Sequence, residues 1–148
     1  MSISVRTDRD RNVILAAAFL GWLCAGIEMG LGPLVSRAAA RDLLYGSSAE
    51  TAARLDEAHI GEWFAWYTAA FLLGGAVGGA MFGRLGDRAG RVRAMGWSIV
   101  CFSVFTGAGW FVRTPEQFLI LRFLASLGVG GMWPAGVALV SEAWPTAS

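Results

Sequence analysis

Two charged side chains lie inside apolar runs of the chain, and their types suit them best to chemistry. Glu28 is the one acid within the apolar residues 13–35, and Arg122 lies near the start of the apolar residues 117–140. An ionisable group within a hydrophobic span usually faces a partner or a water-filled cavity, because its charge is costly in hydrocarbon. We therefore expect Glu28 and Arg122 to be partners. Glu28 is a candidate site for a proton or a substrate amine, and Arg122 is a candidate anchor for an anionic group.

A static ion pair that only stabilises the fold is the alternative interpretation of these two charges. The charge of Glu28 does not prevent insertion of its span. Ten Leu, Ile, Val and Phe residues in 13–35 contribute about 0.3 to 0.6 kcal/mol each, which offsets a penalty of about 3 kcal/mol for one central charge. A cleaved secretory signal peptide is a competing interpretation of the N-terminal region, but the apolar run continues past Glu28.

Three further residues are placed beside this pair by helix geometry and depth. At 100° per residue, Ser126 and Trp133 return to the helix face that carries Arg122. Trp22 and Trp133 lie at similar depths in their two spans, away from the interfaces where tryptophan usually gathers. Both spans are also interrupted by glycine and proline, at 30–33 and 130–134, and such paired interruptions point to the binding site of a membrane carrier.

The composition defines the class of protein. Of 148 residues, 55% are hydrophobic and 16% are charged, an apolar excess that a soluble domain of this length could hardly bury. Four apolar runs are long enough to cross about 30 Å of hydrocarbon as helices. We predict an all-α integral membrane protein with four transmembrane helices at 13–35, 63–83, 94–112 and 117–140, separated by polar segments at 1–12, 36–62, 84–93, 113–116 and 141–148.

The arginines predict the orientation of these spans. The segments on one side carry seven arginines (6, 9, 11, 84, 88, 91 and 93), and those on the other side carry four (37, 41, 54 and 113). Because positive charge favours the inner side of a membrane, both termini and residues 84–93 should be cytoplasmic, in a multi-pass protein of the plasma or inner membrane.

The same sequence gives no sign of an enzyme, a cofactor, a metal site or nucleic-acid binding. Cys24 and Cys101 lie in apolar runs and are expected to be small buried hydrophobic residues, and His59 has no second ligand at metal-binding spacing. The basic residues are scattered and the net charge is +1. The expected partners are the lipid bilayer and a small-molecule solute.

Residues 83–93 combine glycines with charge between two apolar spans, and we expect a tight charged turn there. Glycines at 83, 86 and 90 would let the chain turn sharply. A simple anchor for the membrane orientation is the alternative role. The residues that carry the pattern are Gly83, Asp87, Arg88, Gly90, Arg91 and Arg93.

The pattern Gly-x-x-x-Asp-Arg-x-Gly-Arg resembles the loop between helices 2 and 3 of the major facilitator superfamily of secondary transporters, with Val92 in a place that is usually basic. Residues 122–134 are similar to helix 4 of the sugar and organic-acid carriers of that superfamily, with Ser126 in place of a glycine and Met132 in place of an acid. The resemblance covers the chain as the first four helices of a twelve-helix fold.

The resemblance implies secondary transport by alternating access, with a sugar or an organic anion as solute and protons or sodium as the coupling ion. It implies that the charged loop pairs with the other half of the transporter and biases one of its states. The chain would then be an N-terminal fragment whose partner is the missing C-terminal half. Two alternatives stay open: a small four-helix dimeric exporter that uses Glu28 for protons, and a membrane subunit or remnant that does not transport.

Close helix packing is expected on one face of residues 63–83. Gly74, Gly75, Gly78, Gly79 and Gly83 form overlapping pairs of small residues four positions apart. Such pairs let two helix backbones approach each other. The face could serve a static bundle or a helix that slides.

Overall fold

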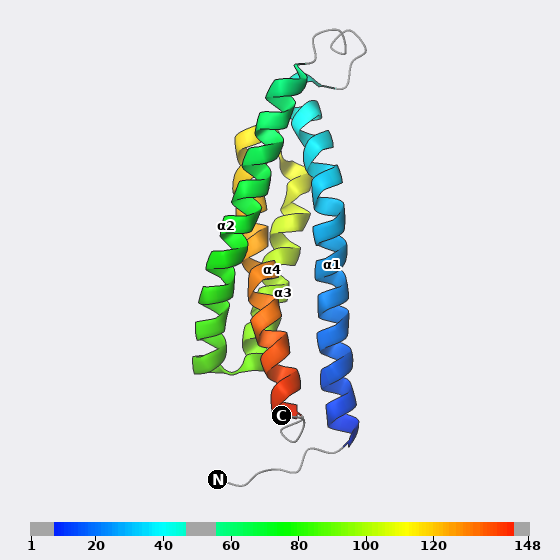
Figure 1. The fold of residues 1–148 in the computed structure, drawn as a ribbon, viewed down its shortest axis with the longest axis vertical. Helices are drawn as coiled ribbons and strands as arrows, with labels where there is room; N and C mark the ends of the chain where they lie inside the picture. Colours follow the sequence, from blue (N-terminus) through cyan, green and yellow to red (C-terminus); the bar gives the residue numbers. More distant parts are fainter. Residues whose placement is uncertain (1–7, 47–55, 144–148) are drawn as a thin grey trace.

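The computed structural model describes residues 8–46 and 56–143, which form four long helices side by side (Figure 1). They are α1 (Asp8–Tyr45), α2 (Glu57–Ala89), α3 (Arg91–Ala108) and α4 (Pro115–Ala143), and a short 3-10 helix, η2 (Gly109–Phe111), extends α3. All four are long and apolar enough to cross a membrane. The prediction of an all-α protein with four spans is confirmed.

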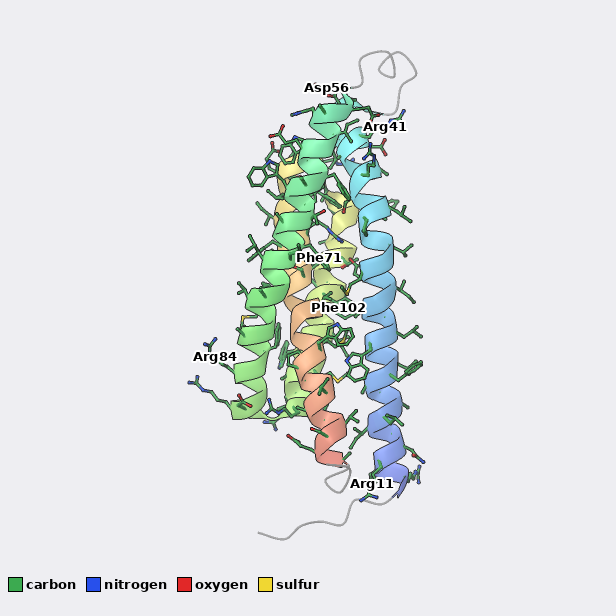
Figure 2. The ribbon with its side chains drawn as sticks, viewed as in Figure 1. Arg11, Arg41, Asp56, Phe71, Arg84 and Phe102 are labelled. Atoms are coloured by element: carbon green, nitrogen blue, oxygen red, sulfur yellow. The ribbon has the colours of Figure 1, made fainter. Side chains whose placement is uncertain are left out.

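The charged side chains labelled in Figure 2 lie toward the two ends of the bundle, as expected for a membrane protein. Arg11 and Arg84 lie toward one end, Arg41 and Asp56 lie at the other, and Phe71 and Phe102 lie between them (Figure 2). Lipid cannot hydrogen-bond to charged groups, so the apolar middle and the charged ends define the two faces of the membrane.

Helix α1 is longer than the apolar run that predicted it, and it stops at a glycine. It continues through the polar residues up to Tyr45, and Gly46 then adopts a positive φ of 73°. The Gly46 amide donates to the Asp42 carbonyl at 2.9 Å, which closes the last turn as a left-handed C-terminal cap does. Residues 36–45 of the expected loop 36–62 are therefore helical, and the pattern that predicts a continuation of the helix over 38–44 with a stop at Gly46 is confirmed.

Helix α2 begins with a side-chain cap. The carboxylate of Asp56 accepts hydrogen bonds from the amides of Ala58 at 3.0 Å and His59 at 3.3 Å. These amides have no partner within the helix, so the cap fixes its first residue. The spacing of Ser47 and Glu50, three residues apart, predicts a capping box for a short helix, but both lie outside the described residues.

The expected charged turn at 84–93 is almost entirely helical, which corrects the prediction. Helix α2 continues to Ala89 and α3 starts at Arg91, so Gly90 alone, with a φ of 95°, turns the chain. Gly86 lies inside α2, where a Cβ atom would come within 3.0 Å of the Arg91 guanidinium. Its lack of a side chain serves packing rather than turning. Gly83 also lies inside α2, with open space around it.

Helix α4 is the packing centre of the bundle, and glycine makes this possible. It packs mainly against α2 and α3 and less against α1. A Cβ atom at Gly78 of α2 would overlap the Leu127 carbonyl, and one at Gly130 of α4 would overlap the Gly75 carbonyl. The backbones of α2 and α4 therefore touch, as the small-residue pattern predicted.

Helix α3 presents one face outward and joins α4 on the other. Trp97 and Val104 are exposed, as expected for a lipid-facing helix. Ser98 is buried, and its hydroxyl donates to the Gly128 carbonyl of α4. Gly128 has no room for a Cβ atom because the α3 backbone lies against it.

Candidate functional site

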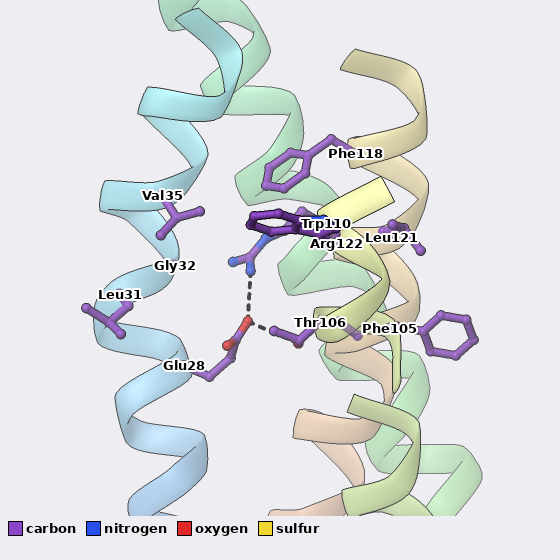
Figure 3. A pocket seen from close by; sticks show the side chains of 12 residues that line it. Glu28, Leu31, Gly32, Val35, Phe105, Thr106, Trp110, Phe118, Leu121 and Arg122 are labelled. Carbon is purple, nitrogen blue, oxygen red and sulfur yellow. Dashed lines mark hydrogen bonds and ion pairs between the residues drawn. The ribbon is translucent and has the colours of Figure 1, made fainter. Parts of the chain in front are cut away.

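The structure brings Glu28 of α1 and Arg122 of α4 into direct contact (Figure 3). Arg122 Nη1 lies 3.0 Å from Glu28 Oε1, and the two side chains are 12% and 18% exposed respectively. The guanidinium also lies over the Phe71 ring, 4.8 Å from its centroid. Gly32 makes the approach possible, because a Cβ atom there would lie 2.6 Å from Arg122 Nη2.

A third polar residue, Thr106 of α3, completes this group. Its hydroxyl lies 3.5 Å from Glu28 Oε1, at the long limit of a hydrogen bond (Figure 3). No motif in the sequence singles out Thr106, although it is one of few hydroxyl residues in the apolar run 94–112. Glu28 Oε1 thus accepts from Thr106 of α3 and from Arg122 of α4.

A cavity of about 310 Å³ opens beside the pair, between α1, α3, η2 and α4 (Figure 3). Its walls are mostly apolar, and Glu28, Thr106 and Arg122 supply its charged and hydroxyl groups. Apolar pockets of this size with a few convergent polar groups are typical of small-molecule sites. The Arg122 guanidinium at its wall could bind an anionic group of a solute in the cavity.

The two tryptophans form a separate feature. Trp22 of α1 stacks on Trp133 of α4 with ring centroids 5.6 Å apart and an interplanar angle of 18°. The Trp22 indole also lies against Gly136, and Trp133 remains 49% exposed. Six residues of helix separate Trp22 from Glu28, which is about 9 Å along the axis. The stack is therefore a neighbour of the ion pair, and neither ring lines the cavity at Glu28.

Ser126 does not reach the cavity. It is fully buried between α4 and α2, where Gly74 lies against its hydroxyl. That hydroxyl donates to the Phe123 carbonyl at 2.8 Å. Helix geometry placed Ser126 on the same face as Arg122, but the tight α2 contact closes that part of the face.

The charged residues around Gly90 form a cluster at the end of the bundle near Arg84. Arg91 Nη2 lies 2.6 Å from Asp87 Oδ1, and Arg91 Nε lies 3.5 Å from Glu142 Oε1 at the end of α4. This cluster ties α2, α3 and α4 together. Arg84 points away from the bundle (Figure 2), and Arg88 and Arg93 are exposed as well.

Cys24 also departs from its expected environment. It was expected to be buried, but it is exposed on the outward face of α1. The buried residues of α1 are instead small ones one or two turns apart: Ala18, Gly21, Ala25, Gly32, Ser36 and Ala40. Small residues let this helix lie close to α4, while many of its larger apolar side chains, such as Phe19, Leu20 and Leu34, are exposed.

Comparison with known proteins gives a family and several relatives. Residues 14–148 match the family model described as Major Facilitator Superfamily. No solved structure gives a significant match.

Three relatives illustrate the likeness. A Bacillus subtilis protein named as a candidate niacin/nicotinamide transporter is 33% identical over 134 residues, which are 90% of this chain and 30% of that protein. The gentisate transporter of Corynebacterium glutamicum is 42% identical over 72 residues, 49% of this chain and 16% of its own length. The benzoate transport protein of Acinetobacter baylyi is 41% identical over 79 residues, 50% of this chain and 17% of its own length. The chain thus spans less than a third of these relatives.

Proposed function

Because the chain belongs to the major facilitator superfamily, we propose that it forms part of a secondary carrier that moves a small organic anion across the membrane by alternating access. The observation that carries the proposal is the Glu28–Arg122 pair beside a cavity of about 310 Å³. A paired acid and base at the wall of a cavity can exchange one partner for a bound solute.

The organic anion is favoured over a sugar as the solute. The guanidinium of Arg122 offers parallel N–H donors, which match the two oxygens of a carboxylate. The relatives are named for niacin or nicotinamide, gentisate and benzoate, and niacin, gentisate and benzoate are planar carboxylic acids. An apolar cavity wall suits the ring of such a solute better than the hydroxyls of a sugar.

We propose the proton as the coupling ion, with Glu28 as its carrier. A proton on Glu28 removes the negative charge that occupies Arg122, and the guanidinium is then free to bind the carboxylate of the solute. Loss of the proton restores the ion pair and expels the anion. Sodium fits this site less well, because Arg122 Nη1 lies only 3.0 Å from Glu28 Oε1 and would repel a cation bound to that oxygen.

The proposed setting is the plasma or inner membrane, with both termini and Gly90 on the cytoplasmic side. The excess of arginine on that side supports this orientation. The relatives extend well beyond the matched region, so the proposed carrier includes further helices that complete the cavity. Family membership favours this carrier over the small four-helix exporter.

Uptake of radiolabelled benzoate or nicotinate by cells that express the carrier containing this chain tests the proposal. Glu28→Gln and Arg122→Gln should each abolish accumulation driven by a proton gradient. Glu57→Gln is the matched control, because Glu57 pairs with Arg37 at the exposed start of α2. Unchanged uptake in both cavity variants would contradict the proposal, and no uptake in wild-type cells would favour a subunit that does not transport.

A further inference from the structure

Arg122 borders a second, smaller cavity that the proposed function does not use. This cavity of about 80 Å³ lies between α1, α2 and α4, and its walls include Met29, Pro33, Ser36, Tyr67 and Phe71. Arg122 is the one residue that lines both this cavity and the one at Glu28. Its side chain therefore separates two spaces with different surroundings.

Two buried donors face no protein partner at this place. Arg122 Nε and the hydroxyl of Tyr67 are both inaccessible to solvent, and neither has a hydrogen-bond partner among the described residues. Tyr67 is 1% exposed and packs in a T-shaped arrangement with Phe118, with ring centroids 4.8 Å apart. A buried polar group left without a partner destabilises the fold, so both groups need one.

The cavity also offers acceptors. Pro33 has no amide hydrogen, so the Met29 carbonyl, four residues earlier in α1, loses its usual helical donor. The side chain of Ser36 is buried at the same wall and brings a hydroxyl group. Residues that carry free donors and acceptors thus line one small space, which is the setting in which buried water is found.

We propose that this cavity is a water-binding site, and that Tyr67 acts through the bound water as a positioning residue for Arg122. A volume of about 80 Å³ has room for two waters at about 30 Å³ each. One water accepts from Arg122 Nε and bonds to the Tyr67 hydroxyl, and the Met29 carbonyl accepts from the water. A cation is a less suitable occupant than water, because the positive charge of the Arg122 guanidinium would repel it. An anion is also less suitable, because Glu28 already neutralises the charge of Arg122.

The consequence rests on the proposed function. When Glu28 takes up a proton, the guanidinium loses its charged partner on one side. The water and Tyr67 keep its Nε atom fixed on the other side, so Nη1 still points into the larger cavity. Tyr67 thereby sets the pH at which Arg122 changes partners.

X-ray radiolytic labelling of the chain in lipid nanodiscs, in water enriched in oxygen-18, tests for the water directly. Hydroxyl radicals form from water, so a buried side chain beside bound water is labelled and a dry one is protected. Tyr67 should be labelled several-fold faster than Met132, which is fully buried in the apolar cluster with Ala18 and Ala25. Met132 is a demanding reference, because methionine is readily oxidised and would be labelled if water reached it.

Protection of Tyr67 at the level of Met132 would overturn the proposal. Labelling that disappears when chloride is added would instead indicate an anion in the cavity, and would overturn it too. Tyr67→Phe should lower labelling at position 67, because the water loses one of its partners. Tyr45→Phe removes a hydroxyl at the C-terminal end of α1 that does not line the cavity, and it should leave labelling at Tyr67 unchanged.

The pH dependence of uptake then tests the positioning role. Tyr67→Phe should shift the midpoint of the uptake profile, and Tyr45→Phe should not. An unshifted midpoint in Tyr67→Phe would contradict that role. Labelling of Tyr67 does not depend on transport. The water site can therefore be confirmed or rejected even if the uptake experiment contradicts the proposed function.

Discussion

Glu28 Oε1 and Arg122 Nη1 lie 3.0 Å apart although 94 residues separate them in the chain. The contact joins the least buried helix, α1, to the most buried one, α4. Because both side chains are largely withdrawn from solvent, removal of one partner leaves the other charged and unpaired.

Loss of one charge should therefore destabilise the bundle more than loss of both. Glu28→Gln or Arg122→Gln alone should cost up to about 3 kcal/mol, and the double variant should recover part of that loss. Unfolding in detergent, followed by circular dichroism, gives the coupling energy. The exposed pair Arg37 and Glu57 is the control and should show little coupling. Additive effects at Glu28 and Arg122 would show that the pair is not coupled.

The contact between the α2 and α4 backbones predicts a strong effect at Gly78. Gly78→Ala places a methyl group on the Leu127 backbone, which cannot move aside, and should cost about 1–3 kcal/mol or prevent folding. Gly83→Ala, one and a half turns away with open space around it, should be neutral or slightly stabilising because alanine favours a helix. Thermal unfolding of both variants measures the difference, and equal stabilities would contradict the backbone contact.

The stacked tryptophans should contribute to the attachment of α1. Trp133→Ala removes the ring pair and should lower stability by about 0.5–1.5 kcal/mol beyond the effect of lost area. The near-ultraviolet circular dichroism signal of the coupled indoles should disappear as well. Trp110→Ala is the control, because Trp110 is 87% exposed. A spectrum that Trp133→Ala leaves unchanged would mean that the rings do not stack.

Gly90 should resist substitution for a conformational reason. Its φ of 95° and ψ of 146° lie in a region open almost only to glycine, so Gly90→Ala should cost about 1–3 kcal/mol. Gly96→Ala, inside α3 with free space at the Cβ position, is the matched control. If the two variants unfold at the same temperature, the turn does not need glycine.

The sequence predicted the helices well because length and hydropathy determine which segments can cross a membrane. It also predicted the Glu28–Arg122 contact, since two charges in apolar spans have few other partners. Ser126 was misplaced for a different reason. Its helix face is open near Arg122 but closed by α2 one turn later, and periodicity along one helix does not reveal where a neighbour lies.

The same limit explains what sequence reasoning missed. Thr106 and Tyr67 belong to other helices, and only the packing of α2 and α3 on α4 brings them to Glu28 and Arg122. The turn at Gly90 was predicted too long because its charges suggested a loop. Arginine is a good helix former, so charge alone does not end a helix, and the Asp87–Arg91 pair joins the end of α2 to the start of α3 across the turn.

The connection between α2 and α3 is a single residue, so it cannot lengthen or bend to absorb a relative movement of the two helices. Since Gly90 alone separates α2 from α3, any tilt or vertical shift at that end of α2 must pass to α3 without being absorbed. We therefore expect α2 and α3 to move together as one rigid unit at that end of the bundle. Because Arg91 pairs with both Asp87 and Glu142, the end of α4 should move with them.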